Sequence, residues 1–134
     1  MLIISTISRY ISYLSNCWYG KTHDYCMLKG EFPADKDWFN EKQLRVDLGF
    51  IGIDSDYRCK EVIIPRKKPR NQELSASAKE ANKQCARERI YVEHSIGGLK
   101  RYRILSDRLR LRNINFYNEV LEVCAGLWNY CLTN

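Results

Sequence analysis

Residues 75–100 read SASAKEANKQCARERIYVEHSIGGLK, and this stretch decides how the chain folds. Its apolar side chains recur at steps of three, four or seven residues, which is the spacing of one face of an α-helix. They are Ala78, Ala81, Cys85, Val92, Ile96 and Leu99. Ser77 and Glu80 have the spacing of a capping box, a pattern that marks helix starts. The stretch therefore predicts a long amphipathic helix that begins at about residue 75.

Two glycines, Gly97 and Gly98, stand near the end of this predicted helix. Each costs about 1 kcal/mol relative to alanine in a helix interior. We therefore expect the pair either to loosen or bend the helix or to let another element pack closely against it.

The residues before this helix have the pattern of β-strands. Residues 1–15 predict a hairpin with strands at 2–4 and 10–14, because β-branched and aromatic side chains flank a polar turn near Ser8 and Arg9.

Two more strands are expected further along. One covers residues 44–48 and brings Asp47 to its end, two residues before Gly49. The other covers residues 61–64 and stops at Pro65, which cannot donate a ladder hydrogen bond.

Two further helices complete the expected elements. Thr22, His23 and Asp24 are N-cap candidates for a short helix that runs to Lys29. A last helix over residues 116–131 would bury one stripe of side chains. The stripe consists of Phe116, Val120, Val123, Leu127 and Cys131. Strands followed by helices place the chain in the α/β or α+β class, and its 134 residues fit one domain at most.

The net charge of +6 is unevenly distributed. Up to Asp56 there are 6 basic and 8 acidic residues, and after it 16 basic and 8 acidic ones. The basic residues gather in two runs, which are Arg66, Lys67, Lys68 and Arg70, then Lys100, Arg101, Arg103, Arg108, Arg110 and Arg112. Such runs occur on ordinary solvated surfaces and in contacts to a phosphate backbone, and both interpretations stay open.

Other classes of protein are disfavoured by the cysteine and apolar patterns. The 6 cysteines include no Cys-x-x-Cys pair, and the 2 histidines stand far apart, so reduced and mostly buried cysteines are expected, with zinc as a minor alternative. Polar residues interrupt the apolar start, so we expect no signal peptide, no membrane span and a cytoplasmic location.

Two carboxylates could carry chemistry. Glu93 shares one face of the predicted helix with Arg89 and Lys100 and lies beside the apolar stripe, although a simple ion pair with Arg89 is the ordinary alternative. Asp47 ends a strand at an edge where α/β sheets hold ligands, although capping a turn is its ordinary alternative. Asp24 is a weaker candidate, because an aspartate at a helix start is usually a cap.

Five stretches together form a specific pattern that runs on from the hairpin. They are GKTHD at 20–24, VDLGFIG at 46–52, IPRKKP at 64–69, VEHSIGGLKRYRIL at 92–105 and GLWN at 126–129. The pattern resembles the DDE transposases of bacterial insertion sequences, which are DDE superfamily endonucleases, and it covers essentially the whole chain. The resemblance implies an α/β, ribonuclease-H-like fold, with a mixed sheet flanked by helices.

The family's helix signature is Tyr-x2-Arg-x3-Glu-x6-Lys. It is met at Arg89, Glu93 and Lys100, but Ala86 stands where the family has tyrosine. The resemblance implies that Glu93 is the catalytic glutamate and Asp47 the second catalytic aspartate.

The resemblance also implies a metal site and a DNA partner. Asp47 and Glu93, with Asp24 as a weaker third ligand, would bind two Mg²⁺ or Mn²⁺ ions. His23 and Asp24 match a motif near the family's active site. The residues expected to contact DNA or orient Glu93 are Arg66, Lys67, Lys68, Arg89, Lys100 and Arg101.

In the family the first catalytic aspartate lies on a central strand upstream of the hairpin. We therefore expect residues 1–134 to be the C-terminal part of a catalytic domain, truncated at its N-terminus. Too few carboxylates would remain to hold both ions, and the uncovered sheet edges would make the chain poorly stable alone.

Three functions remain as hypotheses. The first is an inactive catalytic-domain remnant that still binds transposon ends or target DNA near the nucleoid. The second is an active nuclease, completed by Asp24 or in trans by an upstream polypeptide. The third is a non-enzymatic basic module that binds DNA or inhibits transposition through homo- or hetero-oligomers.

Overall fold

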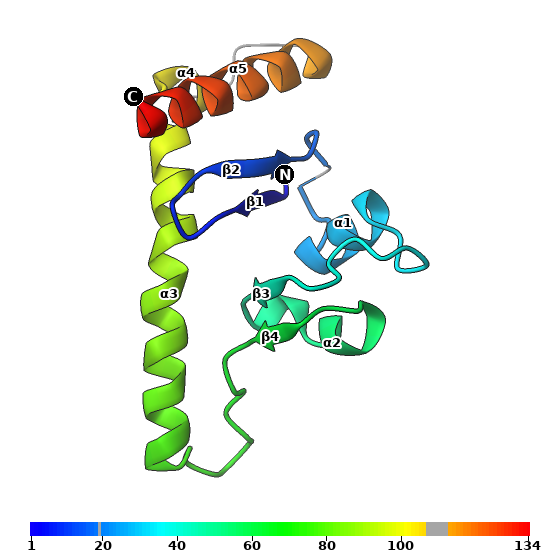
Figure 1. The fold of residues 1–134 in the computed structure, drawn as a ribbon, viewed down its shortest axis with the longest axis vertical. Helices are drawn as coiled ribbons and strands as arrows, with labels where there is room; N and C mark the ends of the chain where they lie inside the picture. The colour runs from blue at the N-terminus through cyan, green and yellow to red at the C-terminus, as the bar shows by residue number, and fades with distance from the viewer. Residues whose placement is uncertain (19, 107–112) are drawn as a thin grey trace. The chain divides into compact units, whose positions relative to one another are not determined.

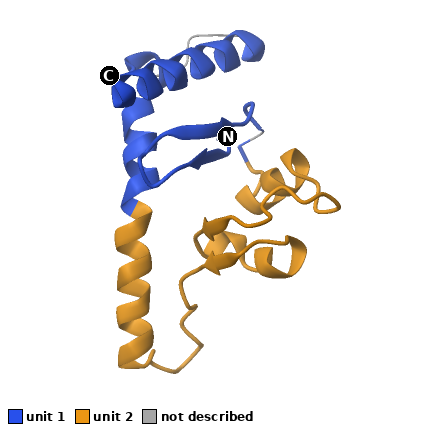
Figure 2. Ribbon diagram, viewed as in Figure 1, with its two compact units in different colours: residues 1–20, 90–134 blue, residues 21–89 orange. Residues whose placement is uncertain are grey.

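The computed structural model describes every residue except 19 and 107–112, and its described residues form a mixed α/β fold with two small sheets (Figure 1). The chain divides into two compact units, as Figure 2 shows. We call residues 1–20 with 90–134 the terminal unit, and residues 21–89 the central unit. Each unit is described by itself.

The terminal unit contains the expected hairpin. Strand β1 (Ile3–Ser5) pairs antiparallel with β2 (Ile11–Leu14), with an irregularity between Ile4 and Ser5. Arg9 forms the turn in the left-handed region, with φ 69°. The hairpin prediction is confirmed to within about one residue at each strand.

Three helical segments complete the terminal unit. They are the last part of α3 (Ala76–Lys100), α4 (Arg103–Ser106) and α5 (Ile114–Thr133). Ile11, Leu99, Cys124 and Ala125 form a buried cluster that joins the hairpin, α3 and α5. The Asn129 amide adds a polar tie, because it accepts a hydrogen bond from the Ile11 N–H at 2.8 Å and donates one to the Ile11 oxygen at 2.9 Å.

The buried stripe expected on the last helix is wrong in most of its members. Phe116, Val123 and Leu127 are 48%, 61% and 47% exposed, and Cys131 is also exposed. The buried face instead follows Leu121, Cys124 and Ala125. Small side chains at 124 and 125 allow close approach to the hairpin, so packing distance rather than apolar size decides which face is buried.

Gly98 explains how α3 and α5 come together. A Cβ atom at this position would lie 2.3 Å from Cε3 of Trp128, whereas Gly97 has nothing within 4 Å. Helix α3 continues through both glycines to Lys100. Of the two expected roles for this pair, close packing is the one that Gly98 has.

The central unit begins with α1 (Asp24–Glu31), in which the side chain of His23 is the N-cap. Strand β3 (Gln43–Arg45) pairs in parallel with β4 (Glu61–Ile63). Between them lie the 3₁₀ helix η1 (Leu48–Phe50) and the short α2 (Ile53–Asp56). The first part of α3 completes the unit.

The buried side chains of the central unit surround a group of aromatic rings. Phe39 contacts Phe32 and Tyr57, with ring centroids 5.4 Å apart in each pair. The Tyr57 hydroxyl donates a hydrogen bond to the backbone oxygen of Phe32 at 2.6 Å. This bond helps to hold the Tyr57 ring in place within the group. Met27, Leu28 and Ile53 are also buried.

Two local predictions in this unit need correction. The strand expected over residues 44–48 ends at Arg45, because Asp47 caps η1 instead of continuing the strand. The capping box expected at Ser77 and Glu80 lies inside α3. Ser75 caps that helix, and its hydroxyl accepts a hydrogen bond from the Ala78 N–H at 3.2 Å.

The cysteines are free thiols, and of the six only Cys124 is buried, so the expectation of mostly buried cysteines is wrong. Within the described parts of the chain, no helix is both long and apolar enough to cross a membrane.

Candidate carboxylates and basic surfaces

Asp47 is held by the turn that follows β3. Its Oδ1 accepts a hydrogen bond from the Gly49 N–H at 2.8 Å, and it serves as the N-cap of η1. The ordinary interpretation, an aspartate that caps a turn, is therefore confirmed. The cap uses one carboxylate oxygen, and the second makes no hydrogen bond to the described residues, which leaves it able to bind a ligand.

His23 lies close to this turn. A Cβ atom built on Gly49 would be 2.9 Å from Oδ1 of Asp47 and 3.8 Å from Cε1 of His23. Gly49 thus separates the imidazole from the carboxylate. The His23 Nδ1 accepts a hydrogen bond from the Tyr25 N–H at 3.3 Å, so Nε2 carries the proton when the ring is neutral.

Asp24 is the first residue of α1, and its side chain is exposed. The cap that the sequence suggested for it is provided by His23. In the part of the chain that the structure describes, no three His, Cys, Asp or Glu side chains gather closely enough to hold a metal ion.

Glu93 is exposed on α3, as are Arg89 and Lys100. The residue spacing predicted that Glu93 lies beside the buried stripe of the helix, and this prediction is wrong. The buried side of this part of the helix is formed by Ser95, Gly98 and Leu99. At 100° per residue these positions lie roughly opposite Glu93.

Small side chains account for this difference. The Ser95 hydroxyl donates to the backbone oxygens of Arg9 at 3.0 Å and of Tyr91 at 3.1 Å, and Ser95 has no exposed surface. Together with Gly98 it lets the hairpin and α5 approach, while the bulkier Val92 and Ile96 stay half-buried. Glu93 consequently lies on the exposed side of α3.

The two basic runs lie on different units. Arg66, Lys67 and Lys68 follow β4 in the central unit and are exposed. Lys100, Arg101 and Arg103 are exposed in the terminal unit, where the Arg101 guanidinium lies 6.0 Å from the centroid of the Trp128 ring. The remaining members of the second run, Arg108, Arg110 and Arg112, lie outside the described residues.

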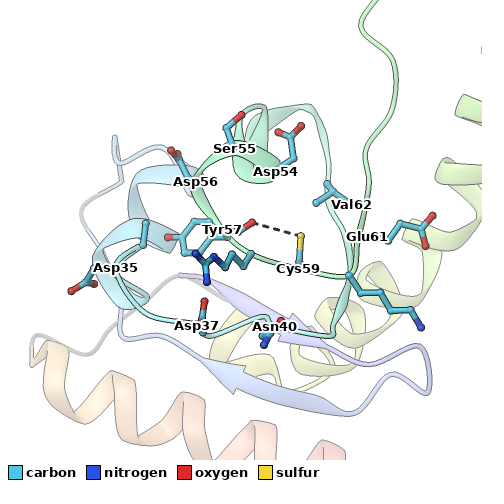
Figure 3. Close-up of a pocket in the computed structure, with 13 residues that line it drawn as sticks. Asp35, Asp37, Asn40, Asp54, Ser55, Asp56, Tyr57, Cys59, Glu61 and Val62 are labelled. Atoms are coloured by element: carbon cyan, nitrogen blue, oxygen red, sulfur yellow. Dashed lines mark hydrogen bonds between the residues drawn. The ribbon is translucent and has the colours of Figure 1, made fainter.

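A pocket of about 700 Å³ lies in the central unit, and Figure 3 shows its lining. Neither Asp47 nor Glu93 lines it. Its acidic residues are Asp35, Asp37, Asp54, Asp56 and Glu61. The pocket is therefore separate from the carboxylates that the sequence singled out.

Asp56, at the end of α2, is tied to α1. It pairs with Lys29 at 2.6 Å and accepts a short hydrogen bond from the Tyr25 hydroxyl. The Lys29 hydrogen bond, followed by that of Tyr25, lowers the pKa of Asp56. Burial, followed by Asp56, raises the pKa of Tyr25. Sequence reasoning missed this network, because its partners are about 30 residues apart and follow no shared periodicity.

Comparison with known proteins links these features to one family. The family described as DDE superfamily endonuclease matches residues 1–129. A probable transposase for insertion sequence element IS702 from Microchaete diplosiphon is 32% identical over 111 residues, which cover 83% of this chain. The match spans only 38% of that relative's own length. No solved structure matches the chain.

Proposed function

Because the chain belongs to the family of DDE superfamily endonucleases, we propose that it contributes Asp47 and Glu93 to metal-dependent DNA cleavage and strand transfer. The observation that carries this proposal is the family match over residues 1–129, a range that contains both carboxylates. The fold we propose for the catalytic domain is ribonuclease-H-like. Acting on DNA would place the protein with the nucleoid in the cytoplasm.

The chemistry of the two side chains fits a hard divalent ion. Carboxylate oxygens are the ligands that Mg²⁺ and Mn²⁺ prefer, and Asp47 keeps one oxygen outside its turn. Such ions, when bound, prepare the attacking oxygen and stabilise the leaving oxygen of a phosphodiester. Asp47 and Glu93 would hold them, with Asp24 as a weaker additional ligand.

Basic residues on the helix that carries Glu93 would position the DNA. Arg89 lies four residues before Glu93 and Lys100 seven residues after it, so all three share one helix face. We assign Arg89 and Lys100 to orienting Glu93 or contacting the phosphate backbone.

These 134 residues, taken alone, do not cleave DNA in this proposal. Two carboxylates leave most of an octahedral Mg²⁺ shell to other donors, and the described residues contain no cluster of three metal-binding side chains. Asp24 would add only a weak ligand in this proposal, so a further strong carboxylate would come from outside these residues, in the same or in a second polypeptide.

A cleavage assay tests both parts. The purified chain is incubated with transposon-end DNA and Mg²⁺ or Mn²⁺, with and without a polypeptide that carries an upstream strand and its aspartate. We expect cleavage only in the supplemented reaction, and its loss in Asp47→Asn and in Glu93→Gln. Cleavage that persists in both variants would refute the role of these carboxylates, and cleavage by the chain alone would refute the need for a third.

A second candidate is a DNA-binding or inhibitory module that joins other transposase chains without catalysis. Exposed basic residues after β4 favour it, because among the described residues they pair with no carboxylate. Its mark would be salt-sensitive DNA binding that Glu93→Gln leaves intact, and inhibition of an intact transposase by this chain. Without that inhibition, this candidate reduces to DNA binding alone.

A further inference from the structure

The basic segment, defined as residues 66–70, carries Arg66, Lys67, Lys68 and Arg70 within five positions. All four side chains are exposed, and none forms an ion pair with a described residue. Elsewhere in the central unit, Arg45 and Lys79 do pair with carboxylates, each at 2.6 Å. Four neighbouring like charges repel one another, so the segment favours a polyanionic partner.

One side chain fixes the backbone of this segment. The Oδ1 of Asn82 accepts a hydrogen bond from the Arg66 N–H at 2.7 Å, and its Nδ2 donates to the Arg66 oxygen at 2.9 Å. Asn82 is half-buried in the second turn of α3. Because both bonds go to the backbone, the Arg66 guanidinium is left to meet a ligand.

The far end of the segment is fixed by local structure. Asn71 adopts the left-handed region with φ 61°, which turns the chain after Arg70. Ser75 then caps α3 through its hydroxyl. Figure 1 shows this stretch leaving β4 and reaching the start of α3. Of these ties, only the Asn82 bonds connect the segment to a residue distant in sequence.

We infer that Asn82 is a positioning residue of a DNA-binding surface, which holds the basic segment extended so that Arg66, Lys67 and Lys68 contact the phosphate backbone of duplex DNA. This inference rests on the proposed function. An unrestrained segment would lose backbone entropy on binding. The two Asn82 hydrogen bonds restrain the backbone at Arg66 and so remove part of that loss before DNA arrives, which is the general benefit of preorganisation.

Binding of the full chain to a short fluorescein-labelled duplex, measured by anisotropy at several salt concentrations, tests the inference. Asn82→Ala should weaken binding by roughly three- to tenfold, the loss expected for one or two hydrogen bonds. The triple variant Arg66→Ala, Lys67→Ala, Lys68→Ala should weaken binding as well. It should also reduce the slope of log affinity against log salt concentration by roughly 0.9 per lost phosphate contact. Adding Asn82→Ala to the triple variant should cause no further loss, because the three side chains that Asn82 is inferred to position are then absent.

Gln84→Ala is the matched control, because it removes an amide from the same helix whose partner is Glu88 and not the basic segment. We expect it to bind DNA like the unmodified chain. The inference is overturned if Asn82→Ala leaves the affinity unchanged, or weakens binding equally in both backgrounds. If the triple variant binds DNA as tightly as the unmodified chain, the proposed contact between the basic segment and DNA is refuted.

Hydrogen exchange of the unmodified chain provides a test that does not depend on how a variant folds. The Arg66 amide should exchange slowly before DNA is added, because Asn82 already holds it. Exchange as fast as that of an unbonded amide, slowed only by DNA, would show that the two Asn82 hydrogen bonds form on binding and would overturn the inference.

Discussion

The indole Nε1 of Trp128 donates a hydrogen bond to the backbone oxygen of Arg9 at 3.0 Å, and the same oxygen accepts the Ser95 hydroxyl at 3.0 Å. One side chain from α3 and one from α5 therefore donate hydrogen bonds to the same backbone oxygen in the hairpin turn. Arg9 adopts the left-handed region there, with φ 69°. Trp128 of the GLWN stretch and Ser95 of the stretch 92–105 thus have a structural role in the terminal unit.

Gly98→Ala should destabilise the chain by about 1–3 kcal/mol, the range expected for overpacking. A Cβ atom there would lie 2.3 Å from the Trp128 ring, so the indole must move and its bond to Arg9 is strained. Gly97→Ala is the control, since nothing lies within 4 Å of its Cβ position. It should be neutral or stabilise by up to about 1 kcal/mol. Urea denaturation measures both, and equal midpoints for the two variants would contradict the packing argument.

Asn129→Asp should destabilise the chain by about 1–3 kcal/mol, because it removes a donor and places a carboxylate against the Ile11 oxygen. Asn118→Asp is the matched control. Its Oδ1 only accepts a hydrogen bond, from the Cys17 N–H at 3.0 Å, and a carboxylate can accept the same bond. We expect little change for this variant in urea denaturation. A smaller loss at position 129 than at position 118 would contradict the two-bond account.

Local periodicity predicted which elements exist, and it was most accurate where a pattern is long. The helix expected from residue 75 is α3, which starts at Ala76. The hairpin and the strand before Pro65 were also found. The buried face of α5 could not be predicted, because it depends on the fit of Trp128 over Gly98, which are 30 positions apart.

The long-range hydrogen bonds of Asn82 and Asn129 could not be predicted from the sequence for a related reason. Asn82 meets Arg66 across 16 residues, and Asn129 meets Ile11 across 118. Amide side chains carry no periodic signal that identifies a distant backbone partner. At Asp47 the sequence did offer the right alternative, since Asp before Gly favours a cap, and that preference shortens β3.

Asp56→Asn should remove part of the stability of the chain at neutral pH and little of it in acid. The folded state lowers the pKa of Asp56, so its contribution is present above the unfolded value of about 3.9 and is lost as the pH falls through the lower folded value. Urea midpoints measured from neutral to acid pH should converge for the two proteins. Asp54→Asn, on the same short helix, is the control. A pH-independent difference at Asp56 would contradict the ion pair with Lys29.

Gly49→Ala should reduce the cleavage activity that depends on the Asp47 carboxylate more than it reduces the stability of the fold. Its Cβ atom would lie 2.9 Å from Oδ1 of Asp47, so the carboxylate must swing away and lose its bond to the Gly49 N–H. Asp47 has a short, half-buried side chain that can move, and we expect a stability loss of only about 1 kcal/mol, close to one hydrogen bond. In the supplemented cleavage reaction we expect activity to fall at least tenfold, because the metal-binding oxygen is displaced.

Gly52→Ala separates these two effects. Gly52 has φ 96°, and nothing lies within 4 Å of its Cβ position, so alanine there strains the backbone without touching Asp47. It should lower stability by about 1–2 kcal/mol, the cost of a left-handed non-glycine residue. Below its unfolding midpoint it should keep its cleavage activity. If Gly49→Ala keeps full activity while Gly52→Ala loses it, the position of the Asp47 carboxylate does not limit the reaction.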